Sequence, residues 1–392
     1  MSPIATARAN EAGTGLTRRM ARHTKGSYTL LLSGTILLAS FDAPAASGQS
    51  AYDRIWSYAH LYQSDTGLVR EFSLSGRLQA DAIFFDTQEG DFSETEWRRF
   101  RFGFKSHLAR DWLVHVEGDF DLNAEPGTGY SRLTDAYVGW EPSPDRALKV
   151  LKHSAGFTLD GATSSKKLLM LERNNLTNNL WFTEEYFTGA SVKGSGEQWD
   201  YWVGVFSNDG NDELSKFDAS YFTLTSLGYN WAERLGLDNA TVRLDYIYNQ
   251  RDENANTADF SNVVSLTSKW EKGPWGLWTD LSAGRGYFDQ SDLWGLSLMP
   301  FFSLSERIQL VGRYTYIESE EANGIRFERY QKQVIEGLGD EYHDASIGLN
   351  VFFYGHKMKW QSVIQYTAMA DKADDGGDHH GWGVATGLRI YW

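Results

Sequence analysis

Three basic side chains lie at even spacing in the segment 95–109, where Arg99, Arg101 and Lys105 are two and four residues apart. If this segment is a β-strand, all three point to the same side and form a ladder of positive charge. A guanidinium group presents a planar fork of donors that pairs with two oxygens of an oxyanion. The chemistry that these residues can do is therefore reversible binding of anions.

Other basic residues can extend this ladder if they face the same space. The long segment 157–184 is of a length that is uncommon in a loop without a function. Folded into a barrel lumen, it would bring Lys166, Lys167 and Arg173, with Glu172, to the narrowest point. Charges at a constriction select ions because the field is focused there. The predicted anion-binding and pore-lining residues are Arg77, Arg99, Arg101, Lys105, Lys149, Lys166, Lys167, Arg173, Lys193, Arg243 and Arg313.

A second interpretation of each basic residue is that it keeps the wall hydrated and pairs with a nearby carboxylate. The candidate carboxylates on the same strand faces are Asp81, Glu117, Asp119 and Asp245. For any single arginine, pairing with a carboxylate is as probable as a role in ion selectivity. The set as a whole, together with the long loop, favours ion selection.

Residues for covalent or metal chemistry are sparse. The chain has no cysteine, which removes thiolate nucleophiles and ligands. Ser106 and Ser154 each neighbour a histidine, His107 and His153, but adjacent residues of a strand face opposite sides. The acidic, histidine-containing segment 371–380 is interpreted as a solvated loop. We therefore predict no catalytic residue, no metal site, no cofactor and no enzyme activity.

The elements that must position the basic residues are strands, because apolar residues recur at every second position from residue 71 onward. Most of these segments are about ten residues long, the length of a tilted strand that crosses a bilayer. The predicted strands are 71–86, 95–109, 111–121, 131–141, 147–156, 185–194, 198–208, 218–231, 239–250, 260–271, 274–286, 291–302, 306–319, 341–353, 357–370 and 380–392.

The connections between these strands alternate in length. The short connections are 109–111, 195–196, 272–274, 303–305 and 354–356. The long, polar ones are 87–95, 123–130, 157–184, 208–217, 251–260, 319–341 and 371–380. Short turns on one side and long loops on the other are typical of bacterial outer-membrane barrels. We predict an all-β, antiparallel transmembrane barrel of about 16 strands, with short periplasmic turns, long extracellular loops and the third loop folded into the lumen.

Both ends of the chain agree with this topology. Alternate positions from Trp382 to Trp392 are mostly apolar and predicted to face lipid, whereas Arg389 faces the lumen. Near the N-terminus, an apolar run at 28–41 follows a basic stretch and precedes small residues, which predicts a secretory signal peptide at 1–46. Residues 47–70 are predicted to be a short periplasmic lead-in with a little helix, and 71–392 to form the barrel. The net charge of −15 argues against a nucleic-acid partner.

Several stretches resemble the phosphate-selective porin O and P family. These are 75–86, 97–103, 110–112, 117–120, 133–138 and the sequence Thr-Ser-Ser-Lys-Lys-Leu-Leu-Met-Leu-Glu-Arg at 163–173. The clear match covers roughly residues 71–210. The chain departs from the family pattern at Glu184 and Glu185, where a basic or small residue is usual, and it has no lysine cluster in the segment 251–260. Both departures put selectivity for phosphate in doubt.

The resemblance implies a homotrimeric porin of the Gram-negative outer membrane that passes small anions such as phosphate or polyphosphate-like oxyanions. The C-terminal strand also resembles the signal read by the barrel-assembly machinery, and the outer surface is expected to meet lipid and lipopolysaccharide. Two alternatives stay open. One is a general porin without anion preference, and the other is an outer-membrane barrel hydrolase.

Overall fold

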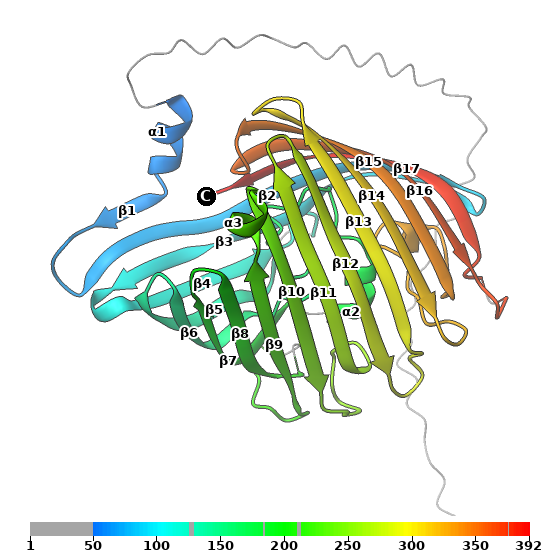
Figure 1. The fold of residues 1–392 in the computed structure, drawn as a ribbon, viewed down its shortest axis with the longest axis horizontal. Helices are drawn as coiled ribbons and strands as arrows, with labels where there is room; N and C mark the ends of the chain where they lie inside the picture. The colour runs from blue at the N-terminus through cyan, green and yellow to red at the C-terminus, as the bar shows by residue number, and fades with distance from the viewer. Residues whose placement is uncertain (1–49, 125–128, 183–184, 210–212, 375) are drawn as a thin grey trace, which may run out of the picture. The chain divides into compact units, whose positions relative to one another are not determined.

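The computed structural model describes residues 50–124, 129–182, 185–209, 213–374 and 376–392. Sixteen antiparallel strands form a closed sheet in which each strand pairs with the next along the chain and the last pairs with the first (Figure 1). The strands of the barrel are β2 Val69–Thr87, β3 Gly90–Leu108, β4 Trp112–Phe120, β5 Tyr130–Ser143, β6 Arg146–Ser154, β7 Tyr186–Ser195, β8 Trp199–Ser207, β9 Tyr221–Asn230, β10 Asn239–Asn249, β11 Phe260–Lys272, β12 Trp275–Gly286, β13 Leu293–Ser303, β14 Ile308–Ser319, β15 Glu341–Tyr354, β16 Met358–Ala370 and β17 His379–Tyr391.

The predicted barrel of about 16 strands is confirmed, and one predicted loop is wrong. The segment 87–95 was expected to be a long polar loop, but β2 and β3 continue through it and are joined at residues 88–89. Phe85 pairs with Phe92 and Thr87 with Gly90 in this extension. Backbone pairing in a hairpin does not require apolar side chains, which is why the polar composition of this segment misled the prediction.

Side chains alternate between the two faces of the wall, as the apolar residues at every second position predict. On β17, Trp382 is 59% exposed on the outside, whereas Arg389 and Ala385 are buried. On β3, Phe102 and Phe104 face outward, whereas Arg99 and Arg101 are buried. The wall therefore has an apolar, aromatic outside and an inside rich in charged groups.

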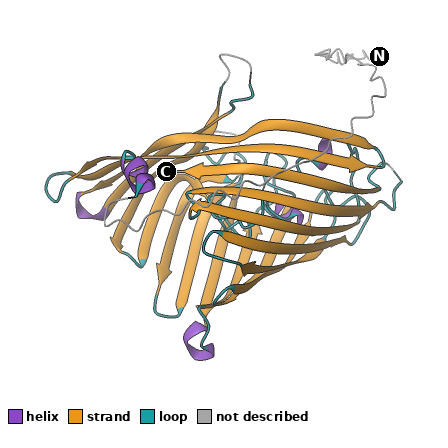
Figure 2. Cartoon of the chain, turned by 90° about the horizontal axis from the view of Figure 1, so that it is seen from above, coloured by secondary structure: helices purple, strands orange, loops and turns teal. Residues whose placement is uncertain are grey.

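The helical segments are short and lie outside the strands of the barrel (Figure 2). They are α1 Ala51–Ser57, α2 Asn175–Leu180 and α3 Ala232–Leu235, with the 3₁₀ turns η1 Ala109–Asp111 and η2 Gln331–Gln333. In the part of the chain that the structure describes, none of the helices is long and apolar enough to traverse a membrane.

The N-terminal arm, residues 50–63, lies against the seam where the barrel closes. Ser50 caps α1 in a capping box with Asp53. The strand β1 His60–Gln63, which the sequence did not predict, pairs with β2 at Glu71–Ser73. Trp56 Nε1 donates to the Tyr391 carbonyl at 2.7 Å. The arm thus covers β2 where it extends past the end of β17.

Residues 155–182 and 185, the described part of the connection between β6 and β7, lie inside the barrel, and we call this part the lumen loop. Its backbone amides at Thr158 and Leu159 donate to Asp245 on β10 and Asp280 on β12, at 3.0 and 2.8 Å. Helix α2 packs against β12, β13 and β14. Two inward-facing glycines permit this approach, since a Cβ at Gly284 or Gly295 would lie 2.7 Å from a leucine of α2.

A second connection, residues 320–340 between β14 and β15, also folds against the lumen contents. Asn179 of α2 donates to the Arg326 carbonyl and accepts from its amide, at 3.1 and 2.8 Å. The Tyr330 hydroxyl reaches Asp81 on β2 at 3.0 Å and Glu96 on β3 at 2.9 Å. Ile325 and Phe327 join the apolar cluster around α2. One part of the lumen is therefore filled by two packed loops.

Candidate functional site: a charged constriction

Two cavities inside the barrel share Arg173, Trp181 and Glu185. The outer cavity, about 520 Å³, is lined by β3 and by the 320–340 connection. The inner cavity, about 220 Å³, is lined by β6, β7 and the lumen loop. The three shared residues therefore lie between the two cavities, and we call them the eyelet.

Three arginines of β3 line the outer cavity: Arg98, Arg99 and Arg101. The alternation of side chains along a regular strand predicts only Arg99 and Arg101 on this face. Gln79 pairs with Arg99 but Ala80 pairs with Trp97, so Arg98 is the extra residue of a β-bulge. The bulge turns Arg98 inward, where Nε and Nη2 contact the two oxygens of Glu172 at 2.6 and 3.0 Å. Arg99 donates to Gln79 at 2.8 Å and is 3.9 Å from Glu172.

Arg101 and Arg173 converge on one carboxylate at the eyelet. Arg101 is 2% exposed and contacts Glu185 at 3.1 Å and Asp119 at 3.3 Å. Arg173 contacts the other oxygen of Glu185 at 2.9 Å, and its guanidinium lies 4.6 Å from the Trp181 ring centroid. Partly buried carboxylates thus hold both arginines in position and neutralise part of their charge.

The inner cavity is lined by lysines that rest on aromatic rings. The ammonium of Lys149 lies 4.3 Å from the Tyr137 ring centroid, and that of Lys193 lies 3.7 Å from the Trp202 centroid. A ring face attracts a cation without cancelling its formal charge. Arg77, also at this cavity, instead pairs with Glu117 at 3.1 Å and donates to Ser165 of the lumen loop at 2.7 Å.

Two of the remaining predicted residues hold the lumen loop in place. Arg243 pairs with Asp245 at 2.8 Å and donates to the Thr158 carbonyl at 2.9 Å. Arg313 pairs with Asp344 at 3.2 Å and donates to the Glu172 carbonyl at 2.9 Å. These contacts agree with the interpretation of charged wall residues as partners of nearby groups.

The other three predicted residues do not line either cavity. Lys105 is half-buried near the short-turn end of β3, and Lys167 is exposed on the lumen loop. Lys166 lies 5.1 Å from the ring centroid of Tyr391 at the end of the last strand.

Sequence reasoning missed several basic residues at the same place. Arg132, Arg329 and Lys332 line the outer cavity beside Arg98. Lys359 is fully buried and donates from Nζ to the Leu168 carbonyl of the lumen loop. The inward direction of Lys359 could have been predicted, because the neighbouring Trp360 faces outward and adjacent residues of a strand face opposite sides. The bulge at Arg98 and the path of the 320–340 connection could not be predicted from the sequence.

Serine–histidine contacts such as the following also escaped the sequence reasoning, because they join different strands. Ser191 on β7 lies 2.7 Å from His153 Nε2 on β6, and His153 Nδ1 lies 2.9 Å from the Leu151 carbonyl. His115 Nε2 lies 3.1 Å from Ser75, whose hydroxyl donates to Glu117 at 2.6 Å. The earlier exclusion considered only neighbours in sequence and was incomplete.

The ionisable groups Lys166 and Glu172 of the lumen loop both have shifted pKa values. Burial, assisted by the charge of Arg77, lowers the pKa of Lys166 to about 8. Burial alone would raise the pKa of Glu172, but Arg98 and Arg99 outweigh it and hold that pKa below its ordinary value. Among the described residues, no group of three or more His, Asp or Glu side chains is placed to hold a metal ion.

The fold of this barrel is similar to the folds of outer-membrane channels of known structure. It is similar to the channel DcaP of Acinetobacter baumannii, with TM-score 0.57 and 11% identity over 84% of this chain and 99% of that one. OmpF of Salmonella typhi, in complex with daunomycin, gives TM-score 0.58 and 11% identity over 85% and 100%. The trimer form of Vibrio cholerae OmpT gives TM-score 0.52 and 10% identity over 82% and 99%.

The closed 16-stranded barrel with charged groups on its inside has the fold of an outer-membrane porin. A family profile for phosphate-selective porin O and P matches residues 72–290, and the chain belongs to that family. No curated protein matches the sequence. The protein is therefore a channel of the outer membrane, and the predicted family and location are confirmed.

Proposed function

We propose that this porin passes small anions, of the phosphate or polyphosphate-like oxyanion class, in preference to cations. The observation that carries the proposal is the balance of charge on both sides of the eyelet. The outer cavity is lined by seven arginine and lysine side chains against four aspartate and glutamate side chains. The inner cavity is lined by four against two. An excess of positive charge between low-dielectric walls concentrates anions there.

The departures from the family pattern affect the strength of this preference. Glu185 lies at the eyelet and pairs with both Arg101 and Arg173, whereas Glu184 lies outside the described residues. The excess charge therefore rests chiefly on Lys149 and Lys193, which lie against aromatic rings, and on Arg99, which donates to Gln79 and lies 3.9 Å from Glu172. We propose that anions pass the eyelet by exchanging contacts with these three residues.

The proposal is tested by the reversal potential of single channels of the full-length protein in a KCl gradient. Its sign reports whether chloride or potassium carries the current. Inhibition of chloride current by added phosphate then ranks phosphate among the anions. A reversal potential near zero would support a general porin without anion preference and would overturn the proposal.

The oligomeric state is part of the same proposal. We infer a homotrimer from the family and from the trimer form of the Vibrio cholerae neighbour. Native mass spectrometry of the detergent-solubilised protein measures this directly, and a monomeric mass would contradict it.

Anion preference should weaken in alkaline solution because Lys166 loses its charge. This lysine has a pKa of about 8, so it is charged at neutral pH and becomes neutral as the pH rises further. The ratio of anion to cation permeability is expected to fall between about pH 7 and about pH 9. In the variant Lys166→Arg the side chain stays charged over this range, and the fall should be smaller. An identical pH profile in both proteins would exclude Lys166 as the titrating group.

For the alternative of a barrel hydrolase, the contact of Ser191 with His153 is the relevant one, because the hydroxyls of Ser73 and Ser75 donate to Glu71 and Glu117 instead of to a histidine. Two features oppose it. Ser191 is 3% exposed, and His153 Nδ1 contacts a main-chain carbonyl instead of a carboxylate. A carboxylate at this position normally stabilises the charged imidazole that forms during acyl transfer.

We accordingly expect no labelling of Ser191 by a small fluorophosphonate, which modifies activated serines. Mass spectrometry of the intact protein detects the adduct. The variant Ser191→Ala is the control for labelling elsewhere. An adduct that forms in the parent protein and is lost in Ser191→Ala would establish the hydrolase alternative.

A further inference from the structure

The side chain of Glu172 occupies a place in the outer cavity that an oxyanion could fill. Its two carboxylate oxygens accept hydrogen bonds from Nε and Nη2 of Arg98, at 2.6 and 3.0 Å. A carboxylate and a phosphate present similar pairs of oxygens to the fork of a guanidinium group. Glu172 therefore lies against Arg98 as a bound oxyanion would, although it belongs to the chain itself.

This ion pair is accessible from the outer cavity. Both side chains line the cavity, and the exposed fractions are 14% for Arg98 and 18% for Glu172. The carboxylate of Glu185 differs, because it lies between the buried guanidinium groups of Arg101 and Arg173. An incoming anion can thus reach the fork of Arg98 more readily than either arginine of the eyelet.

The backbone at Glu172 is held in place, so the side chain is the part that can leave the fork. Arg313 donates to the Glu172 carbonyl at 2.9 Å, and Arg389 donates to the carbonyl of the preceding residue at 3.3 Å. Arg99 lies 3.9 Å from the carboxylate and offers it a second cationic partner. A displaced carboxylate therefore stays within reach of Arg98 and can return to it.

We propose that Glu172 is an internal competitor of the passing oxyanion for Arg98, an inference that rests on the proposed function. An entering oxyanion displaces the carboxylate from the guanidinium fork, and the carboxylate displaces the oxyanion in turn when it rebinds. Conduction requires binding that is strong enough for entry and weak enough for release. Glu172 promotes release, because two neighbouring arginines without a competing carboxylate would hold an oxyanion for longer.

The test is the inhibition, by inorganic phosphate, of the single-channel chloride current through the full-length porin. The variant Glu172→Gln should be half-inhibited at an about tenfold lower phosphate concentration, because no carboxylate then competes for Arg98. The current that phosphate itself carries at saturation should fall, because release becomes slower. Asp119→Asn removes one charge from an equally exposed side chain of the same cavity and leaves Arg101 paired with Glu185. It should change the inhibition much less.

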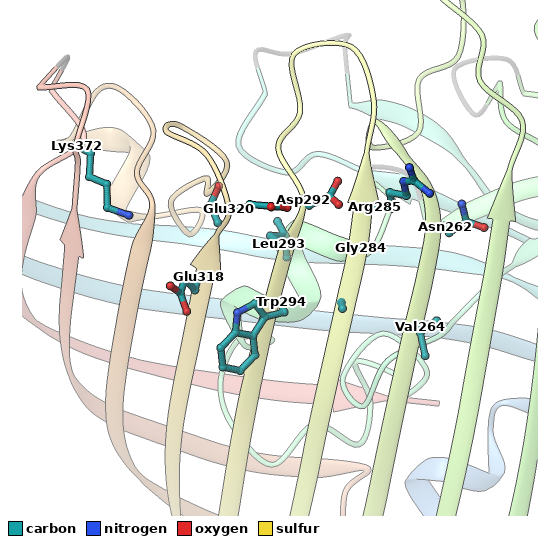
Figure 3. A pocket seen from close by; sticks show the side chains of 12 residues that line it. Asn262, Val264, Gly284, Arg285, Asp292, Leu293, Trp294, Glu318, Glu320 and Lys372 are labelled. Carbon is teal, nitrogen blue, oxygen red and sulfur yellow. The ribbon is translucent and has the colours of Figure 1, made fainter.

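A second pair of variants tests the role of the guanidinium fork. Arg98→Lys keeps the positive charge but lacks the planar fork. In this background, Glu172→Gln should change phosphate inhibition no more than Asp119→Asn does, because the competition needs both partners. Arg285→Lys is the matched control, since Arg285 is exposed in a groove on the outer wall, away from the lumen (Figure 3). Its inhibition should equal that of the parent.

Two results would overturn this role of Glu172. One is an equal shift of inhibition in Glu172→Gln and Asp119→Asn, which would assign the effect to the net charge of the cavity. The other is unchanged inhibition in Glu172→Gln at normal conductance, which would make the residue a structural partner of Arg98. The reversal potential of the same channels tests the proposed function separately. A value near zero in the parent would contradict anion preference, while the comparison of phosphate inhibition still decides the role of Glu172.

Discussion

The double variant Lys149→Glu/Lys193→Glu is expected to prefer cations over anions. The two lysines line the inner cavity and rest on rings instead of carboxylates, so the structure leaves their charge largely uncompensated. Exchanging them for glutamate turns an excess of positive charge at this cavity into an excess of negative charge. The reversal potential in a KCl gradient should therefore change sign, because field lines focus in the narrow lumen.

Two control variants separate the position of the charge from its amount. Lys149→Gln/Lys193→Gln removes the charge without reversing it and should give an intermediate reversal potential. Lys216→Glu alters an exposed lysine in the connection between β8 and β9 and should leave selectivity unchanged. If the reversal potential of the glutamate pair keeps its original sign, selectivity does not reside at the inner cavity.

The variant Asp245→Ala/Asp280→Ala is expected to enlarge the pore. These carboxylates accept the buried amides of Thr158 and Leu159 and thereby fasten the lumen loop to β10 and β12. Each buried amide that loses its acceptor costs about 1–3 kcal/mol. The loop should then leave the wall for part of the time, and single-channel conductance should rise and fluctuate more strongly.

The matched control for this variant is Asp245→Asn/Asp280→Asn. Asparagine keeps an oxygen for the backbone amide but carries no charge, so the two variants distinguish the hydrogen bond from the electrostatic effect. Conductance of the asparagine pair should stay close to that of the parent. Equal conductance in both pairs would show that charge, and not the attachment of the loop, determines the pore size.

The inward and outward residues of the barrel wall could be predicted because side-chain direction repeats every two residues along a strand. That alternation placed Arg77, Arg99, Arg101, Lys149 and Lys193 on the inside, where the structure has them. It failed where the repeat is interrupted, as at the bulge that turns Arg98 inward. A bulge depends on the register between two paired strands, and this register cannot be predicted from the residues of either strand alone.

The interior of the barrel was harder to predict than its wall. The neutralising contacts of Glu172 and Glu185 join residues from separate strands and a loop, so no spacing in the sequence reveals them. The inward path of the 320–340 connection also depends on contacts between residues that are far apart in the sequence. Its buried residues Ile325 and Phe327 find apolar partners only after α2 is in place. Local pattern therefore predicts the strands, whereas the site depends on contacts over long distances.

The seam between β17 and β2 has a consequence for the order of folding. All other neighbours in the barrel are also neighbours along the chain, but this pairing joins residues such as Arg77 and Tyr391. Bringing such distant residues together from a flexible chain costs about 4 kcal/mol more entropy than closing a short hairpin. Closure is thus the slowest contact to become favourable. β1 pairs with β2 at Glu71–Ser73, outside the stretch Arg77–Thr87 that β17 pairs with, so it covers that short part of the edge without competing with closure.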